Sequence, residues 1–232
     1  MSPDTKRKPP QISKVRRRAE VVLVHGLWHQ PEHFGLLAAA LRRLGATVHI
    51  PRLHRGSLAA DTAVVQEEVD ACAEMPIVMG HSYGGSVITG LERVRHLIYV
   101  AAFVPAAGES GALLGGAGAL VNDAVCQNDD GTTSIKPERA AGVLYGDCTE
   151  AESIWATDLL VPQRAGHGRG MPSRIGWESI ESTYILCEED KALDPRVQAR
   201  MALRCTSTIR VPYSHSPFIS HAAQLAMMVL EI

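Results

Sequence analysis

The chain has 232 residues, of which 46% are hydrophobic and 21% are charged, the ordinary balance of a globular protein. This length suits one sizeable domain and leaves little room for two. No hydrophobic run in the sequence approaches the roughly 18 residues that a membrane-spanning helix needs. We therefore expect a single globular domain with no membrane-spanning segment.

Charge is unevenly distributed along the chain. The first 20 residues hold seven of the 23 lysines and arginines but only two of the 25 acidic residues. Residues 21–232 therefore carry 16 basic and 23 acidic side chains, a formal charge of −7, which argues against nucleic acid as the main ligand. The basic stretch lacks a hydrophobic core, so it does not resemble a secretory signal. Residues 1–19 are predicted to be a disordered basic leader that could touch an anionic surface.

Five cysteines are spread along the chain, at positions 72, 126, 148, 187 and 205. Their number is odd and no two form a C-x-x-C pair. This pattern is typical of reduced thiols and predicts neither a disulfide framework nor a metal site. We therefore expect a cytoplasmic protein that binds no metal.

Hydrophobic segments alternate with helix-like segments in the first hundred residues. The expected strands are residues 21–24, 47–50, 76–79 and 96–102; the expected helices are residues 31–44, residues 61–73 with Asp61 as the cap, and a helix that begins after Ser82. Short, continuous hydrophobic runs are typical of strands buried on both faces. Their alternation with helices indicates βαβ units and a parallel sheet covered by helices on both faces.

This alternation stops at Pro105. From there to about Ser182 the sequence is rich in Gly, Ala and polar turns, with short helix candidates at 137–146 and 149–160. Strand and helix candidates then resume at 183–187, 195–204, 208–211 and 217–230. We predict an α/β fold, with a mostly parallel sheet flanked by helices. Residues 20–232 would form one domain, in which residues 105–180 are a cap inserted before the strand at 183–187.

Residues 80–84 read Gly-His-Ser-Tyr-Gly, a G-x-S-x-G motif between a hydrophobic strand and a helix. In such a turn the serine adopts a strained, exposed conformation, and Gly80 and Gly84 allow the strand and the helix to pass close together. The serine hydroxyl then lies at a helix N-terminus, where backbone N–H groups can stabilise an oxyanion. Ser82 is therefore the candidate nucleophile.

A serine nucleophile needs a base and an acid that orients the base. Asp190 follows the strand at 183–187, and His215 follows the strand at 208–211. The 25 residues between them fit one helix and one strand, which returns both side chains to the same edge of the sheet. We predict a Ser82–His215–Asp190 triad, with Glu189 and Asp194 as alternative acids.

The oxyanion hole requires two N–H donors. We expect one from Tyr83, directly after the nucleophile, and one from Leu27, in the loop after the first strand. The expected substrate pocket is lined by Gly26, Trp28, Phe103, Val104, Trp155 and Leu159. The sequence contains no dinucleotide-binding or P-loop motif, so no nucleotide site is predicted.

Segments 23–28, 80–85 and 214–218, together with Asp190, resemble the small α/β-hydrolases. Within that superfamily the chain is most similar to bacterial esterases related to plant methyl-ester esterases and hydroxynitrile lyases. The resemblance covers about residues 20–232, and it implies ester hydrolysis without a cofactor. Hydroxynitrile lyases of this group have threonine and lysine where this chain has Gly26 and Ser216, which disfavours cyanohydrin cleavage.

The sequence therefore predicts a serine hydrolase that acts on a small, largely apolar carboxylic ester or lactone. Three alternatives stay open. The same triad could serve a lyase, a C–C bond hydrolase or a cofactor-free oxygenase. The pocket could belong to a ligand-binding receptor with vestigial hydrolysis, or the basic leader could bind a partner. The sequence indicates neither the natural substrate nor the oligomeric state.

Overall fold

The computed structural model describes residues 18–116 and 119–232. The predicted basic leader, residues 1–19, lies outside this part of the chain except for its last two residues. None of the helices in the described residues is long and apolar enough to cross a membrane.

The molecule is built on a six-stranded sheet in which every pair of neighbouring strands is parallel. In spatial order the strands are β2 (Thr47–His49), β1 (Glu20–Val24), β3 (Ile77–His81), β4 (His96–Val100), β8 (Ser182–Cys187) and β9 (Ser207–Val211). Parallel strands require crossover connections, and helices supply most of them. The predicted α/β fold, with a mostly parallel sheet flanked by helices, is confirmed.

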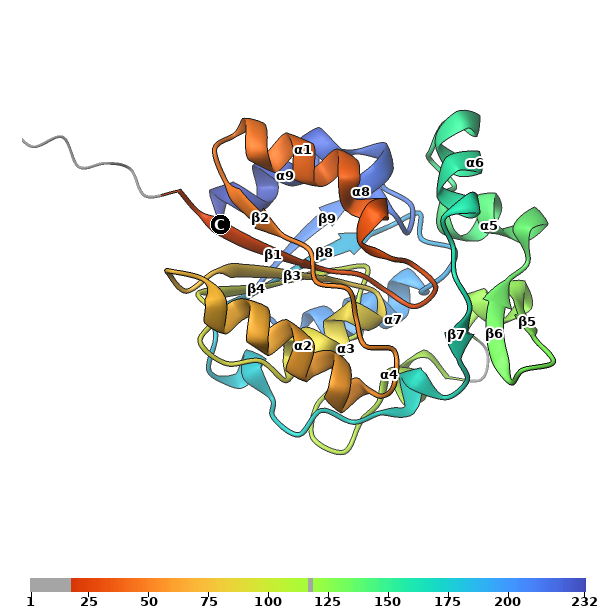
Figure 1. Cartoon of the computed structure of the whole chain (residues 1–232), viewed down its shortest axis with the longest axis horizontal. Coiled ribbons are helices and arrows are strands. Elements are labelled where there is room, and N and C mark those ends of the chain that lie inside the picture. The colour runs from red at the N-terminus through yellow and green to blue at the C-terminus, as the bar shows by residue number, and fades with distance from the viewer. Residues whose placement is uncertain (1–17, 117–118) are drawn as a thin grey trace, which may run out of the picture.

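Helices cover both faces of this sheet (Figure 1). One face carries α1 (Gly35–Arg43), α8 (Pro217–Ser220) and α9 (Ala222–Glu231), and the other carries α2 (Leu58–Ala71), α3 (Tyr83–Thr89) and α7 (Pro195–Ala202). Alternate strand residues enter different hydrophobic clusters: Val21 and Leu23 pack toward α1, whereas Val22 and Val24 pack toward α2. Because both of its faces are buried, β1 has the continuous hydrophobic run Val21–Val24 instead of an alternating pattern.

Between β4 and β8 the chain leaves the main sheet. This inserted segment contains α4 (Gly111–Gly115), η2 (Leu120–Ala124), β5 (Val125–Gln127), β6 (Thr132–Ile135), α5 (Pro137–Leu144), α6 (Glu150–Asp158), β7 (Gln163–Arg164), η3 (His167–Arg169) and η4 (Gly176–Glu178). Strands β5, β6 and β7 form a small antiparallel sheet. In Figure 1 this sheet lies with α5 and α6 beside one end of the main sheet.

Hydrogen bonds fix the inserted segment to the loop that follows β1. The Trp28 indole N–H lies 3.2 Å from the Thr133 carbonyl oxygen on β6. The Trp28 carbonyl accepts a hydrogen bond of 2.9 Å from the backbone N–H of Val161. The Gln30 side-chain amide donates to the Leu159 carbonyl at 2.7 Å. The inserted segment therefore lies over the carboxyl end of the main sheet.

Three helices differ clearly from their predicted bounds. The helix expected at 31–44 is divided into a 3₁₀ helix, η1 (Pro31–Phe34), and α1. The helix expected at 61–73 begins three residues earlier, because Ser57 is its cap and accepts a hydrogen bond from the Ala60 N–H. Asp61 is consequently not the cap; it lies inside α2 and is fully buried. The helix expected at 217–230 is interrupted at His221, which separates α8 from α9.

Candidate active site

Ser82 occupies a sharp turn between β3 and α3. Its backbone has φ 53° and ψ −120°, in the region that favours glycine, so the residue is strained. A Cβ at Gly80 would lie 2.6 Å from the Gly84 carbonyl oxygen, and one at Gly84 would overlap the Val24 carbonyl oxygen. The two glycines therefore permit the close approach of strand and helix that the motif predicts. The turn leaves Ser82 half-buried.

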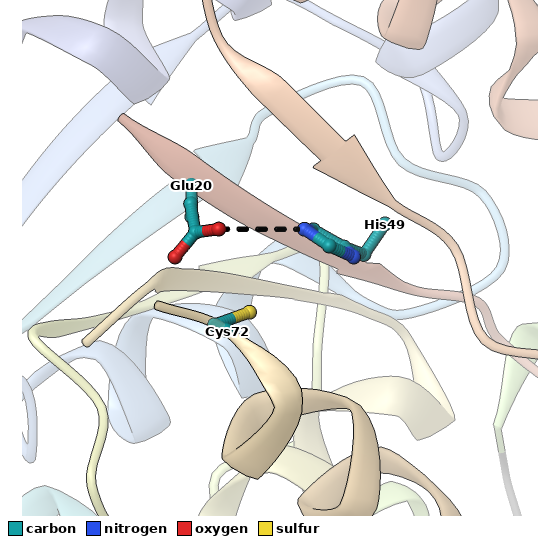
Figure 2. Close-up of side chains that lie close together, drawn as sticks. All are labelled: Glu20, His49 and Cys72. Atoms are coloured by element: carbon teal, nitrogen blue, oxygen red, sulfur yellow. Dashed lines mark ion pairs between the residues drawn. The ribbon is translucent and has the colours of Figure 1, made fainter. Parts of the chain in front are cut away.

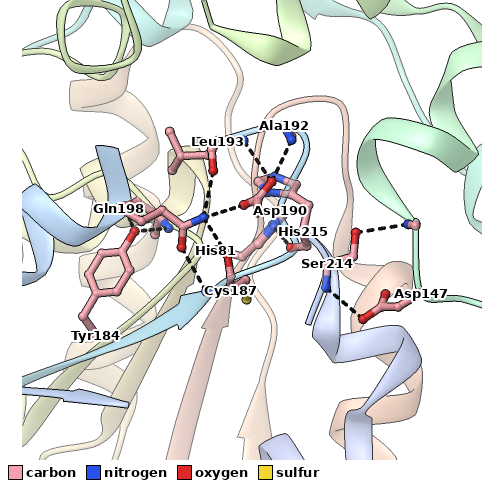
Figure 3. A network of polar contacts seen from close by, with 12 residues as sticks. His81, Asp147, Tyr184, Cys187, Asp190, Ala192, Leu193, Gln198, Ser214 and His215 are labelled. Atoms are coloured by element: carbon pink, nitrogen blue, oxygen red, sulfur yellow. Dashed lines mark hydrogen bonds and ion pairs between the residues drawn. The ribbon is translucent and has the colours of Figure 1, made fainter. Parts of the chain in front are cut away.

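Asp190 and His215 meet at the carboxyl ends of β8 and β9 (Figure 3). His215 Nδ1 lies 2.8 Å from Asp190 Oδ2. Because an ionised carboxylate can only accept, His215 Nδ1 carries the proton and its Nε2 is left as the acceptor. Both residues are about 3% exposed, so water competes little for this hydrogen bond.

Further hydrogen bonds hold the Asp190 carboxylate in place (Figure 3). Its Oδ1 accepts from the backbone N–H groups of Ala192, at 2.7 Å, and Leu193, at 2.9 Å. Its Oδ2 accepts from the Gln198 side-chain amide at 2.8 Å. Gln198 lies fully buried on α7, and its own oxygen accepts from the Cys187 N–H. Nothing in the sequence marks Gln198, because a glutamine in a helix is ordinary.

The two alternative acids have other environments. Glu189 is exposed. Asp194 caps α7 by accepting from the Arg196 N–H, and it pairs with the Arg196 guanidinium. Of the three carboxylates that the sequence left open, the structure brings Asp190 to His215.

The inserted segment also supports the loop that carries His215. The Ser214 N–H donates to Asp147 Oδ2 at 2.9 Å, and the Ser214 hydroxyl accepts from the Gly146 N–H at 3.1 Å. Asp147 and Gly146 lie between α5 and α6. The position of the imidazole therefore depends on the inserted segment as well as on β9.

The loop after β1 packs directly against the serine turn. A Cβ placed on Gly26 would lie 3.0 Å from Ser82 Cβ and 3.1 Å from His81 Nδ1. The loop can therefore approach this closely only with a glycine or after a shift of its neighbours. Leu27 follows and is half-buried. Tyr83 is the first residue of α3, where backbone N–H groups have no acceptor within the helix.

Three of the expected pocket residues lie beside the serine turn or the β1 loop. Phe103 is half-buried and close to the serine turn, since its N–H donates to the Ser82 carbonyl at 3.1 Å. Trp28 and Leu159 lie where the inserted segment meets the β1 loop.

Two other expected pocket residues have different environments. Val104 is fully buried in the hydrophobic cluster beside α7, so it has no surface to offer a substrate. Trp155 is 39% exposed on α6, with its ring 6.2 Å from that of His33.

A cavity of about 590 Å³ opens between α5 and α6. Tyr145, Cys148 and Lys191 are among the residues that line it, and Ser82 is not. Lys191 directly follows Asp190 in the chain, so this cavity adjoins the loop of the acid but not the serine. Apart from Lys191, the cavity is lined by residues of the inserted segment.

Buried histidines lie on the side of His215 that faces the β1 loop and the serine turn. His81 lies with its ring 4.6 Å from that of His215, and His29 lies 5.3 Å from His81. Burial lowers the pKa of His25 to about 4, and it lowers the pKa values of His29 and His81 well below their usual range. These imidazoles are therefore neutral at neutral pH.

Asp61 forms a second buried polar cluster behind the serine turn. It accepts from the Tyr83 hydroxyl at 2.8 Å, from the Arg55 N–H at 2.7 Å and from His167 Nε2 at 3.1 Å. Burial acts to raise the pKa of Asp61, but the hydrogen bonds from His167, Arg55 and Tyr83 outweigh it and lower the pKa. His167 belongs to the inserted segment, so Asp61 joins that segment to α3. The sequence reading missed this cluster, because its members are far apart in the chain.

The parallel sheet, the strained serine after β3 and the acid–histidine pair after β8 and β9 define an α/β-hydrolase fold. Residues 21–227 match the model of the Alpha/beta hydrolase family. The chain belongs to this family, as its sequence motifs predict.

Two relatives are similar over different parts of the chain. The alpha/beta hydrolase nvfD of Aspergillus novofumigatus is 27% identical over an alignment of 237 residues, gaps included. The alignment covers 90% of this chain and 94% of that protein. A carbendazim hydrolyzing esterase of a Nocardioides species is 38% identical over 109 residues, 40% of this chain and 45% of that protein.

Solved structures show the same fold. A pyrethroid hydrolase from Sphingobium faniae superposes with a TM-score of 0.78 at 22% identity, over 93% of this chain and 97% of that one. Polyneuridine aldehyde esterase gives a TM-score of 0.77 at 17% identity, over 93% and 99% of the two chains. At these identities the likeness establishes the shared fold.

Proposed function

We propose that this protein is a serine esterase that cleaves a small, largely apolar carboxylic ester or lactone. The observation that carries the proposal is the buried His215–Asp190 hydrogen bond of 2.8 Å, at the same end of the sheet as the strained Ser82. Membership of a hydrolase family supports it, and so does similarity to proteins named as esterases.

In the proposed reaction, Ser82 Oγ attacks the ester carbonyl carbon while His215 Nε2 takes the hydroxyl proton. Asp190 stabilises the resulting imidazolium and holds the ring in the tautomer whose Nε2 is free to accept. Collapse of the tetrahedral intermediate breaks the bond to the alkoxy group, which leaves with the proton from His215. Water then attacks the acyl carbon with His215 again as the base. The bond to Ser82 Oγ breaks, Oγ takes the proton back from His215, and the acid is released.

The backbone N–H groups of Leu27 and Tyr83 would donate hydrogen bonds to the negatively charged oxygen of the intermediate. Loss of one such donor typically costs about 3–4 kcal/mol of transition-state stabilisation. The contact of Gly26 with Ser82 supports this assignment, because it brings the Leu27 backbone beside the nucleophile. The 105–180 segment serves as the cap, with Phe103, Trp28 and Leu159 bordering the acyl site.

The proposal is tested with p-nitrophenyl acetate, butyrate and octanoate, using wild type, Ser82→Ala and Ser86→Ala side by side. Ser86 is the matched control, since it is a second serine close to the turn, buried within α3. We expect Ser82→Ala to lose at least about a thousandfold in kcat, while Ser86→Ala keeps it within about threefold. The preference for chain length then measures the depth of the pocket.

Covalent labelling with a fluorophosphonate separates an activated serine from the other reactions of this fold. We expect wild type and Ser86→Ala to be labelled and Ser82→Ala to stay unlabelled. Ester turnover that survives Ser82→Ala would disprove the mechanism. A folded wild type that neither labels nor turns over esters would instead favour a lyase, a C–C bond hydrolase or a cofactor-free oxygenase.

A further inference from the structure

Three side chains from three different elements converge away from the active site (Figure 2). They are Glu20 at the start of β1, His49 at the end of β2, and Cys72 directly after α2. One carboxylate oxygen, one imidazole nitrogen and the sulfur lie within 4.8 Å of one another. The sequence predicts no metal site, because these positions are far apart and lack a recognisable ligand spacing.

The fold itself explains why they meet. Glu20 and Val22 point to the same face of the sheet, since they are two residues apart on β1. Val22 is the partner of His49 in the parallel pairing of β1 with β2. The helix α2 covers this face, and both Val22 and Cys72 belong to the hydrophobic cluster beneath it. The cluster is therefore set by strand register and helix packing.

Each of the three side chains has a partner outside the cluster, and the Cys72 thiol donates to the Glu68 carbonyl at 3.3 Å. His49 Nδ1 lies 2.7 Å from Glu68 Oε1, so Nδ1 carries the proton in the neutral ring and Nε2 offers its lone pair. Glu20 Oε2 accepts from the Glu74 N–H at 2.9 Å, which turns Oε1 toward the imidazole. A carboxylate behind a histidine that presents its other nitrogen is the usual arrangement of a zinc-bound histidine.

His49 Nε2 has no hydrogen-bond partner within the described residues, although it is buried from solvent. It lies 4.0 Å from Glu20 Oε1, too far for a hydrogen bond. Ligand atoms on a tetrahedral zinc lie about 3.3–3.7 Å apart, since the bonds are about 2.0–2.3 Å long. The three ligand atoms, which lie within 4.8 Å of one another, would have to close by up to about 1 Å to reach this spacing.

The donor set favours one kind of ion. A thiolate, an imidazole and a carboxylate are ligands for zinc, whereas calcium and magnesium prefer oxygen donors alone. Two carboxylates lie beside the imidazole, Glu68 at 2.7 Å and Glu20 at 4.0 Å. The same two carboxylates give the cluster a negative potential that attracts a cation.

We propose that Glu20, His49 and Cys72 bind one zinc ion, with water as the fourth ligand and Glu68 orienting the histidine. Such an ion would tie β1, β2 and α2 together at the opposite end of β1 from the serine turn. Its role would therefore be structural. The proposal does not depend on esterase activity, so either can fail without the other.

The full-length protein is stripped with a chelator and titrated with Zn²⁺ by calorimetry and with Co²⁺ by absorption spectroscopy. We expect one site per chain and a thiolate-to-cobalt charge-transfer band. Cys72→Ser and His49→Gln should each weaken Zn²⁺ binding by at least about a hundredfold, and Glu68→Gln by about ten- to a hundredfold. The matched controls, Cys126→Ser and His54→Gln, should bind as wild type does.

Thermal unfolding supplies a second readout. A hundredfold excess of Zn²⁺ over its Kd should raise the Tm of wild type by about 5–10 °C and leave that of His49→Gln unchanged. Ester turnover at 25 °C should be the same in all five variants. The proposal is overturned if wild type shows no binding in the micromolar range, or if Co²⁺ binds without a thiolate band. Zn²⁺ binding that survives both His49→Gln and Glu68→Gln would overturn it as well, even if Cys72→Ser failed to fold.

Discussion

The two oxygens of the Asp190 carboxylate have different partners. Oδ1 accepts from two backbone N–H groups in its own loop, whereas Oδ2 accepts from His215 and Gln198. All four neighbours are donors, so the site needs an acceptor at both oxygen positions. An ionised carboxylate meets that need, and a neutral amide can meet only half of it.

This asymmetry predicts the effect of Asp190→Asn. The amide oxygen must take the Oδ1 position, because the backbone N–H groups of Ala192 and Leu193 cannot move away from it. The amide NH₂ then faces His215 Nδ1, which favours the tautomer with the proton on Nε2 and removes the acceptor for Ser82. We expect kcat for p-nitrophenyl butyrate to fall by about 10³–10⁴, with KM within about threefold.

Two matched variants show whether this loss is specific to position 190. Glu189→Gln and Asp194→Asn change the neighbouring carboxylates, one exposed and one a helix cap. We expect both to keep kcat within about threefold, while Asp194→Asn costs at most about 1 kcal/mol of stability. If Asp194→Asn or Glu189→Gln matched the loss in Asp190→Asn, the assignment of the acid would be wrong.

At the level of elements, Tyr83 has two separate parts at the start of α3. Its side chain anchors the helix, and its backbone N–H is the proposed oxyanion donor. Tyr83 donates its hydroxyl to the buried Asp61 at 2.8 Å, and Asp61 also bonds to His167 of the inserted segment. The proposed oxyanion donor is the backbone N–H of the same tyrosine. Side chain and backbone can therefore be separated by experiment.

We expect Tyr83→Phe to lower stability more than activity. The variant keeps the ring and the backbone N–H, but it removes one of the three hydrogen bonds to the Asp61 carboxylate. Urea unfolding should show a loss of about 1.5–3 kcal/mol, the range for a hydrogen bond to a charged group. At 25 °C, kcat should stay within about fivefold of wild type. A thousandfold fall in kcat without loss of stability would instead give the hydroxyl a catalytic part.

The sequence predicted the elements of the main sheet because hydrophobic runs and helix-like segments alternate there. It did not predict β5, β6 and β7, which are two to four residues long and mostly not fully buried. Such strands have no periodicity to detect, and β6 pairs with β7 across about thirty residues of intervening chain. The start of α2 was misplaced because Ser57 and Asp61 are both good caps, and only packing decides between them.

The sequence could predict the candidate site residues that have a local signal, namely those that follow a hydrophobic strand. Ser82, Asp190 and His215 each directly follow a strand, and parallel strands bring their carboxyl ends to one edge. The partners that support them, Gln198 and Asp61, lie on helices, and nothing in their local sequence marks them. The proposed zinc ligands are likewise unmarked in the local sequence, since strand register and helix packing alone bring them together.

Across the whole molecule, the histidines that are buried in neutral form oppose folding in acid. Burial lowers the pKa of His25 in the folded protein to about 4, from an ordinary value of 6.5. Between these pH values the unfolded chain binds a proton that the folded protein excludes. The contribution of His25 is therefore fully present above pH 6.5 and is lost as the pH falls toward 4. His29 and His81 act in the same direction, since burial lowers their pKa values too.

The free energy of unfolding should thus fall steeply in mild acid. A shift from 6.5 to about 4 corresponds to about 3 kcal/mol for His25 alone. Urea unfolding measured at several pH values from about 7.5 down to about 4.5 checks this, because the slope gives the number of protons taken up on unfolding. We expect more than one proton near pH 5.5, and a smaller slope in His25→Gln. Carboxylates with lowered pKa values, such as Asp61, titrate below this window. A free energy of unfolding that stays level across this window would show that burial does not keep His25, His29 and His81 neutral in the folded protein.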